Sequence, residues 1–448
     1  MTTLIPSIAL RTYDGGESMA HSQSMRIPHS CLDLSLIASC PFTSIRPKSP
    51  NPKQETAGTS IPHNGDFLRG FGSELRSSSN AARFNMDPKI GDRFELWNYW
   101  IVFSQRHKTP MQLEPLRRVG DPVADLCVEE LNIKPGADAL QILDQYLSRP
   151  IFQQDADAPR EFRDSALKVP DWVDWDIINQ GQQVYWKYVT AINFVLLHYS
   201  LVGGFGAPRI ARTLRCTNYL SGSPGQSYQR LMETSQMVHD CMIGGIQSLQ
   251  PQTGKGWSSV MRVRLLHTQV RLRILRLADS RPDYCYVEKD GVPINQEDLV
   301  ATLCAFSIAV INSLERMGIY LSPDEEFAYL HIWRLIGHYM GVLPENNPLT
   351  SYEDSLATYH SVLYHLTQQP DDLSADLAKS ILRAVAEKPP LNQSFEFHSA
   401  CARALLGEDR GDALQIESSS LQDRIMAELF FAVLRCPPTP WWTVLLQT

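Results

Sequence analysis

The sequence predicts an all-α protein, with one large helical domain preceded by a disordered tail. Three observations support this class. Apolar residues recur at three- and four-residue steps through most of the chain after about residue 85. The apolar stretches begin at Ser, Asp or Asn caps and end at Gly, as helices do. Alternating apolar runs joined by hairpin dipeptides, the signature of paired strands, are scarce.

Composition divides the chain into three parts. Residues 1–85 are rich in Ser, Pro, Gly and Asn and show no sustained periodicity, so we expect a disordered N-terminal tail. Aromatic residues become dense at "FELWNYWIVF", and the helical domain is predicted over 86–435. Residues 436–448 form an apolar C-terminal tail, whose "WWTVLLQT" could dock on the domain or on a membrane surface.

The first predicted helices follow in order. Asp121 caps "DPVADLCVEEL", and Pro122 stands at its first helical position. "ADALQILDQYL" follows, and then a long helix in "PDWVDWDIINQGQQVYWKYVTAINFVLLHYSL" that "GGFG" at 203–206 interrupts. "APRIARTLRCTNYL" is another short helix.

The later helices carry clearer start signals. Ser223 is the predicted cap of "SGSPGQSYQRLMETSQMVHDCMI", and Ser258 or Ser259 that of the next helix. Asn295 with Asp298 is a variant capping box at the start of "PINQEDLVATLCAFSIAVINSLERMG". "SPDEEFAYLHIWRLIGHYMG" begins at Ser322 in the same way, and more helices fill 351–435.

Charge and cysteine content exclude several classes of protein. The formal charge is −8, so no overall basic field recruits nucleic acid. The 9 cysteines are irregularly spaced and contain no CxxC, which argues against a zinc ribbon and favours reduced thiols.

Membrane and secretion signals are weak. No apolar run reaches the ~18 residues of a transmembrane helix, and "ATLCAFSIAVINSL" is interpreted as a buried helix. The first residues lack the pattern of a secretory signal. A cytoplasmic or peripherally membrane-associated protein is the favoured expectation.

One helix contains the main candidate site. In "RVRLLHTQVRLRIL", residues 262–275, His267 shares an apolar stripe, because Val260, Val263, Val270 and Ile274 lie within about 60° of it around the helix. Arg264 and Arg271, three residues before and four after, border His267 on one flank. One interpretation is a core histidine with its own hydrogen bond and two arginines paired with Asp or Glu. The other is a metal-ligating imidazole in an apolar wall, with arginines facing an anionic ligand edge, as haem b requires.

The order of motifs resembles the rubber oxygenase (latex-clearing protein) catalytic-domain family, which includes fungal oxygenases that cleave the prenyl side chain of a mycophenolic acid precursor. The resemblance covers about residues 95–410 and depends on "PDWVDW", "YQRLMET", "VRLLHTQVR", "GVPINQEDL" and "AYLHIWRLIGHYMG". No single motif is specific by itself, whereas their order in one helical chain is fairly specific.

The resemblance implies a fold, a cofactor and a reaction. The family fold is helical with a globin-like core, and a histidine matching His267 is the proximal ligand of haem b. An R-x-x-x-T element near the haem matches Arg230 and Thr234. Arg264 and Arg271 are then expected to pair with the haem propionates. The expected reaction is cleavage of a carbon–carbon double bond in an apolar prenyl or isoprenoid chain by dioxygen, in fungal-type secondary metabolism.

Departures from the family pattern leave a second hypothesis open. A family lysine before the threonine is Glu233 here, which could act as a base or simply face solvent. Where the family has a glutamate base, this chain has Leu214 and Arg215. The membrane-anchored fungal relatives have an N-terminal hydrophobic segment that is not seen here. The alternative is a non-catalytic helical haem- or lipid-binding protein.

Overall fold

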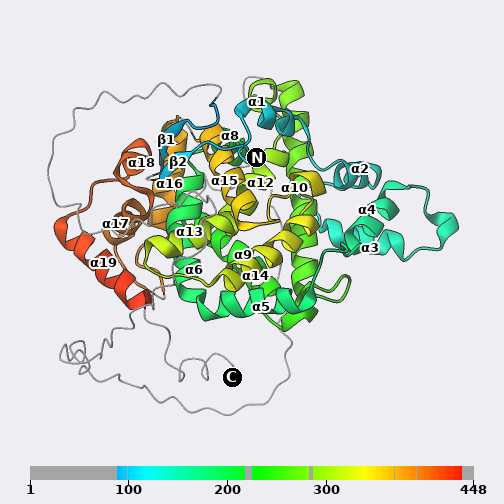
Figure 1. Cartoon of the computed structure of the whole chain (residues 1–448). Coiled ribbons are helices and arrows are strands. Elements are labelled where there is room, and N and C mark those ends of the chain that lie inside the picture. The colour runs from blue at the N-terminus through cyan, green and yellow to red at the C-terminus, as the bar shows by residue number, and fades with distance from the viewer. Residues whose placement is uncertain are drawn as a thin grey trace, which may run out of the picture. The chain divides into compact units, whose positions relative to one another are not determined.

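The computed structural model describes residues 88–97, 99–216, 224–281, 286–367, 369–389 and 391–435. Nearly all regular structure in these residues is helical, which confirms the predicted all-α class (Figure 1). Phe84–Thr448 forms one compact unit, and the chain's other unit, Met1–Arg83, lies outside the described residues. The predicted tails over 1–85 and 436–448 and the predicted cap Ser223 also lie outside them.

The elements follow one another along the chain, with η marking short 3-10 or π segments. The first part contains β1 (Arg93–Leu96), β2 (Tyr99–Val102), α1 (Pro110–Leu113), η2 (Glu114–Arg118), α2 (Pro122–Glu130), α3 (Ala139–Leu147), η3 (Ile151–Gln153), α4 (Ala158–Leu167), α5 (Trp175–Lys187), α6 (Val189–Val195), η4 (Leu196–Leu201), α7 (Val202–Gly204) and α8 (Pro208–Cys216). The second part contains α9 (Pro224–Met242), η5 (Gly245–Leu249), α10 (Lys255–Ser280), α11 (Val287–Asp290), α12 (Gln296–Phe306), α13 (Ile308–Arg316), α14 (Pro323–Tyr339), η6 (Pro344–Asn346), α15 (Tyr352–Leu366), α16 (Asp372–Val385), α17 (Phe395–Leu406), α18 (Glu408–Ala413) and α19 (Leu421–Arg435).

The short hairpin of β1 and β2 was not predicted. The strands are antiparallel, with Arg93 opposite Val102. Their turn contains no Asn-Gly or Asp-Gly pair; it uses Trp97 at a φ of 54° instead. The Trp97 ring is buried, and its Nε1 donates a hydrogen bond to Thr367 Oγ1 at 3.1 Å. Packing of this ring into the helical domain therefore fixes the turn, and local sequence carries no signal for it.

Helix caps were predicted well where a side chain makes the cap. Asp121 accepts a hydrogen bond from the Ala124 amide, and Asn295 and Ser322 form capping boxes. The predicted Ser258 or Ser259 cap is wrong, because α10 already begins after Gly254. Ser259 instead donates a hydrogen bond to Asp240 on the neighbouring helix α9.

The long helix predicted over residues 170–201 is divided into α5, α6 and the π segment η4. Tyr188, with φ of −118° and ψ of 20°, ends α5. The predicted apolar positions Ile192, Val195 and Tyr199 remain buried beyond the break. Periodicity therefore identified the buried face, but not the change of helix direction.

Gly181 allows the close packing of α5 on α14. A Cβ at this position would press against the backbone oxygen of Ala328 and lie 2.9 Å from Cγ2 of Ile332. We expect Gly181→Ala to lower the free energy of unfolding by about 1–3 kcal/mol through overpacking. Gly204→Ala is the control, since nothing lies within 4 Å of its Cβ position. Equal denaturation midpoints for the two variants would contradict the packing role.

The apolar stretch over α12 and α13 is a core element. Gln296–Arg316 is the one described helical stretch that is long and apolar enough to span a membrane by composition, and 72% of its apolar window is buried in the domain. The predicted burial of residues 301–314 is confirmed, but Ser307 divides the predicted single helix into α12 and α13. The described cysteines Cys127, Cys216, Cys241, Cys304 and Cys401 are free and buried, in agreement with reduced thiols.

His198 and His398 form a buried pair. His198 Nδ1 lies 2.9 Å from the Phe194 oxygen, so it donates, and Nε2 then accepts from His398 Nδ1 at 2.8 Å. This arrangement requires a neutral His198 ring, since one of its nitrogens donates and the other accepts. Burial lowers the pKa of His198 to about 3 and that of His398 to about 4.

This pair predicts loss of stability in acid. In the unfolded chain the two histidines take up protons near pH 6.5, whereas in the folded protein they stay neutral to a lower pH. The contribution of the pair to the free energy of unfolding is therefore fully present above about pH 6.5 and is lost as the pH drops toward 4. In His398→Gln one titrating group is gone. The stability difference between the wild type and this variant should therefore shrink by about 2 kcal/mol between pH 7 and pH 5. Urea unfolding at both pH values measures it, and an unchanged difference would contradict the prediction.

Candidate active site around His267

Helix α10 presents His267 between a buried face and an exposed one. Val260, Arg264 and Thr268 are buried on one side, whereas Leu266 is 36% exposed on the other. His267 itself is half-buried. Arg262, Arg273 and Arg276 are exposed, as predicted.

Apolar residues continue the His267 face toward the C-terminal end of α10. Ile274 is 2% exposed and packs against Cys216 at the end of α8, with Val270 beside them. Val263 and Val270 are half-buried like His267. The imidazole thus lies in an apolar stripe to which α8 contributes.

The His267 imidazole is neutral at physiological pH. Burial, together with the nearby Arg271 charge, lowers its pKa to about 4. Its Nδ1 is buried and has no hydrogen-bond partner within the described part of the chain. The core hydrogen bond that one interpretation expected is therefore not found at this atom. A neutral imidazole with an unused nitrogen is the form that ligates a metal.

Arg264 is held by an aspartate. Its Nε and Nη2 donate to Asp121 Oδ2 and Oδ1 at 2.6 and 2.9 Å. Both side chains are buried, at 7% and 6% exposure. The guanidinium also lies over the Phe162 ring, 5.0 Å from its centroid. Asp121 therefore caps α2 and fixes α10 against it.

Arg271, about two helical turns further along α10, is also paired with an aspartate. Its Nη1 contacts Asp125 Oδ1, while Nε and Nη2 donate to the backbone oxygens of Pro293 and Ile294 at 3.0 and 2.9 Å. The side chain is 1% exposed. The structure therefore gives Arg264 and Arg271 aspartate partners in place of the expected propionates. We assign both as positioning residues that fix the orientation of α10.

Helices α9 and α10 form a hairpin whose closed end is fixed by Asp240. This carboxylate accepts a hydrogen bond from Ser259 at 2.7 Å and lies 2.9 Å from Lys255 Nζ. Along α10, His267 lies ~12 Å beyond this contact. Along α9, Thr234 lies ~9 Å and Arg230 ~15 Å before it. The predicted R-x-x-x-T element and His267 therefore lie at similar distances along their helices from the closed end of the hairpin.

Thr234 is an exposed residue on the side of α9 that is otherwise buried. Ser227, Val238 and Cys241 share its side of the helix and are buried, but Thr234 is exposed. Its Oγ1 donates back to the Arg230 oxygen at 3.1 Å.

Glu233 is turned toward solvent. Its side chain is 45% exposed, and its oxygens accept hydrogen bonds from Arg230 at 2.8 Å and Gln229 at 3.0 Å. This geometry favours the solvent-facing interpretation over a base aimed into the site.

The effect of Glu233→Gln separates these interpretations. A glutamine oxygen still accepts from Arg230, so we expect turnover of the haem-loaded protein to change by less than about threefold. Loss of a general base would instead cost roughly 100-fold or more. A rate measured with each variant at equal haem content decides between them, and a collapse of the rate would restore Glu233 as the base.

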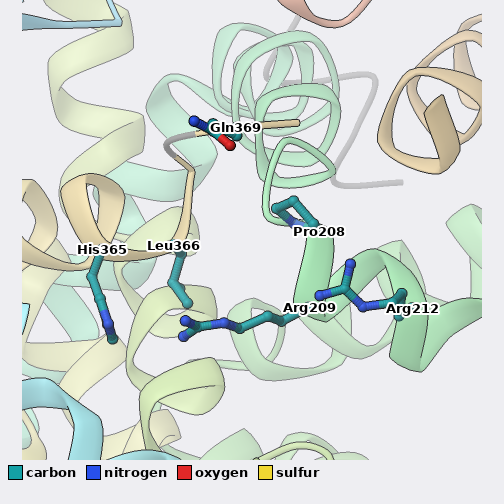
Figure 2. Close-up of a pocket in the computed structure, with 6 residues that line it drawn as sticks. All are labelled: Pro208, Arg209, Arg212, His365, Leu366 and Gln369. Carbon is teal, nitrogen blue, oxygen red and sulfur yellow. The ribbon is translucent and has the colours of Figure 1, made fainter. Parts of the chain in front are cut away.

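A polar cavity elsewhere in the domain was not predicted from the sequence. It measures about 250 Å³ and is lined by Pro208, Arg209, Arg212, His365, Leu366 and Gln369 (Figure 2). Figure 2 shows Arg209 reaching from α8 toward the end of α15, where His365 and Leu366 lie. These residues are far apart in sequence, and neither motif nor period links them.

Buried charges surround this cavity. His365 Nδ1 lies 2.5 Å from Oε1 of Glu297, which is fully buried. Arg212 makes a double hydrogen bond to Asp290 at 2.6 and 2.7 Å. Ligand pockets usually measure about 300–1,000 Å³, so this cavity suits water or a small polar molecule rather than a macrocycle.

The described residues form a helical domain, and comparison with known proteins identifies its family. Residues 186–436 match the family model of the ER-bound oxygenase mpaB/B'/rubber oxygenase catalytic domain. The match covers more than half of the chain, so the chain belongs to this family. It includes Arg230, Thr234 and His267, whereas Asp121 and Asp125 precede it.

Two relatives show how far the similarity extends. A rubber oxygenase from Streptomyces sp. (strain K30) is 25% identical over 269 residues, which are 60% of this chain and 63% of the relative. The chain thus spans just under two thirds of that relative's length. The solved structure of latex clearing protein LCP in the closed state matches with a TM-score of 0.56 at 23% identity, over 73% of this chain and 88% of that one. The structural match supports the helical fold alone.

Proposed function

We propose that this protein is a haem b-dependent oxygenase that cleaves a carbon–carbon double bond in an apolar prenyl or isoprenoid chain. Membership in an oxygenase catalytic-domain family supports the reaction class. The observation that carries the cofactor assignment is His267 Nδ1, a buried nitrogen of a neutral ring with no partner in the described residues.

The residues around His267 fit a haem-binding site. His267 would hold the iron, and the apolar side chains of Val263, Val270 and Ile274 on the same stripe would contact the macrocycle. Haem, when bound, supplies the dioxygen chemistry. The ion pairs of Arg264 and Arg271 keep the helix, and hence the imidazole, in a fixed orientation.

Arg230 and Thr234 are the proposed polar residues on the substrate side. They lie on α9 at a distance from the closed end of the hairpin similar to that of His267 on α10, and Thr234 is exposed. Arg230, which pairs with Glu233, would offer a cation to a substrate, and Thr234 a hydroxyl. Addition of both atoms of dioxygen across a C=C bond gives two carbonyl groups and needs no further reductant.

The test is oxygen consumption by the purified, haem-loaded full chain. With isoprene oligomers or prenylated phenols we expect oxygen uptake and aldehyde or ketone fragments, identified by mass spectrometry. Cleavage of prenylated phenols, but not of isoprene oligomers, would support the proposed place in fungal-type secondary metabolism. A haem-loaded protein that consumes no oxygen with either substrate class would favour the non-catalytic haem- or lipid-binding alternative.

A further inference from the structure

Helix α19 has two apolar faces. Ala427 and Phe431 are buried at 1% and 3% exposure, on the side of α19 that packs into the domain. Figure 1 shows α19 at the edge of the helical domain, near α17. The opposite side, here called the outer face, consists of Leu421, Ile425, Met426, Leu429 and Val433, which are 63%, 50%, 45%, 57% and 66% exposed.

The outer face is unusual for a surface helix. A surface helix normally turns polar residues outward, but here the apolar residues span an arc of about 140° around the axis. Gln422 is the polar residue within that arc. The charged residues Arg424, Glu428 and Arg435 share one flank beside this arc, and Asp423 lies on the other flank. A continuous apolar patch of this kind marks a contact surface.

Size and shape favour a lipid surface over a second copy of the chain. The helix is ~22 Å long and ~10 Å across, whereas stable protein interfaces bury about 800 Å² per partner. A single protruding helix also provides no groove for a peptide. It matches the geometry of an amphipathic helix lying in the plane of a bilayer interface.

Neighbouring residues point to the same partner. Arg435 Nε donates to the Met317 oxygen, which places the nearby Tyr320, 73% exposed, beside the C-terminal end of α19. Residues 436–448 follow directly, contain no charged residue and include Trp441 and Trp442. Tyr and Trp are the residues enriched at membrane interfaces.

We propose that the outer face of α19 inserts into the surface of a lipid bilayer. The charged flank carries both signs and the chain has a net charge of −8, so burial of apolar side chains, not attraction to anionic lipid, drives binding. This contact goes beyond the proposed oxygenase function and does not depend on it.

The test is flotation of the purified full chain with phosphatidylcholine vesicles. We expect binding that about 0.5 M NaCl does not weaken, since it is not electrostatic. The double variant Ile425→Glu/Leu429→Glu should lose at least tenfold in vesicle affinity while its thermal midpoint stays near the wild-type value. The matched control is Ile151→Glu, because Ile151 is 79% exposed on another element.

Each other outcome overturns the proposal. Equal binding by the double variant would show that α19 is not the contact. Loss of binding in Trp441→Ala/Trp442→Ala, with the α19 variant unaffected, would assign the contact to that segment. If the wild-type chain does not bind vesicles but forms dimers, and the double variant does not form them, a second copy of the chain covers this face.

Discussion

His267→Ala is expected to abolish stable haem binding. The substitution removes the one nitrogen that the proposed site offers to the iron, and it leaves an apolar stripe with no ligand. Even the outer partners of a metal ligand typically contribute roughly 10- to 100-fold to affinity, so loss of the ligand itself should weaken binding by more than about 100-fold. Titration of the apoprotein with haem, followed by its Soret absorbance, measures this.

The control for this variant is another histidine that has a partner. His338 Nε2 lies 3.1 Å from the Lys168 oxygen, so His338→Ala should retain the haem affinity of the wild type. Added imidazole should restore the Soret band of His267→Ala, because it supplies the missing nitrogen. An unchanged band in His267→Ala without imidazole would exclude His267 as the ligand.

Asp121→Ala is expected to destabilise the fold by about 3–5 kcal/mol, because it leaves the buried Arg264 cation without its partner. Both side chains of the pair are nearly inaccessible, and Asp121 also caps α2. Equilibrium unfolding in urea, monitored by circular dichroism, gives the difference.

The exposed pair of Arg106 and Asp354 provides the comparison. Its N–O distance is also 2.6 Å, but its side chains are 56% and 41% exposed. Arg106→Ala should therefore cost less than about 1 kcal/mol. Replacing both buried partners, as in Asp121→Leu/Arg264→Met, should recover much of the stability lost in Asp121→Ala. Similar losses for the buried and exposed pairs would contradict the positioning role of Arg264.

Local signals in the sequence predicted most of the helices and the caps at Asp121, Asn295 and Ser322, because a cap and its helix lie within a few residues of each other. The period of α10 correctly placed His267 beside two inward-facing arginines and turned the other three outward. Hydrophobic periodicity identifies the buried face of a helix, but not the residues that pack against that face. The partners Asp121 and Asp125 lie 143 and 146 residues away from Arg264 and Arg271.

Each of the two interpretations of α10 has one observation that supports it. The arginines pair with aspartates, as expected for a core helix. His267 Nδ1 has no such partner in the described residues, as expected for a ligand. Knowing that a side chain is buried does not predict whether it finds a hydrogen-bond partner, because the nearest partner depends on how distant elements pack. The same limit explains why the cavity at Arg209 and His365 could not be foreseen.

The absorption spectrum of the purified full chain, expressed with added haem precursor, tests the central proposal most directly. We predict a Soret band with about one haem b per chain, which remains through gel filtration. A protein that is folded by circular dichroism yet carries no Soret band, and gains none on titration with haem, would contradict the assignment of His267 as a haem ligand.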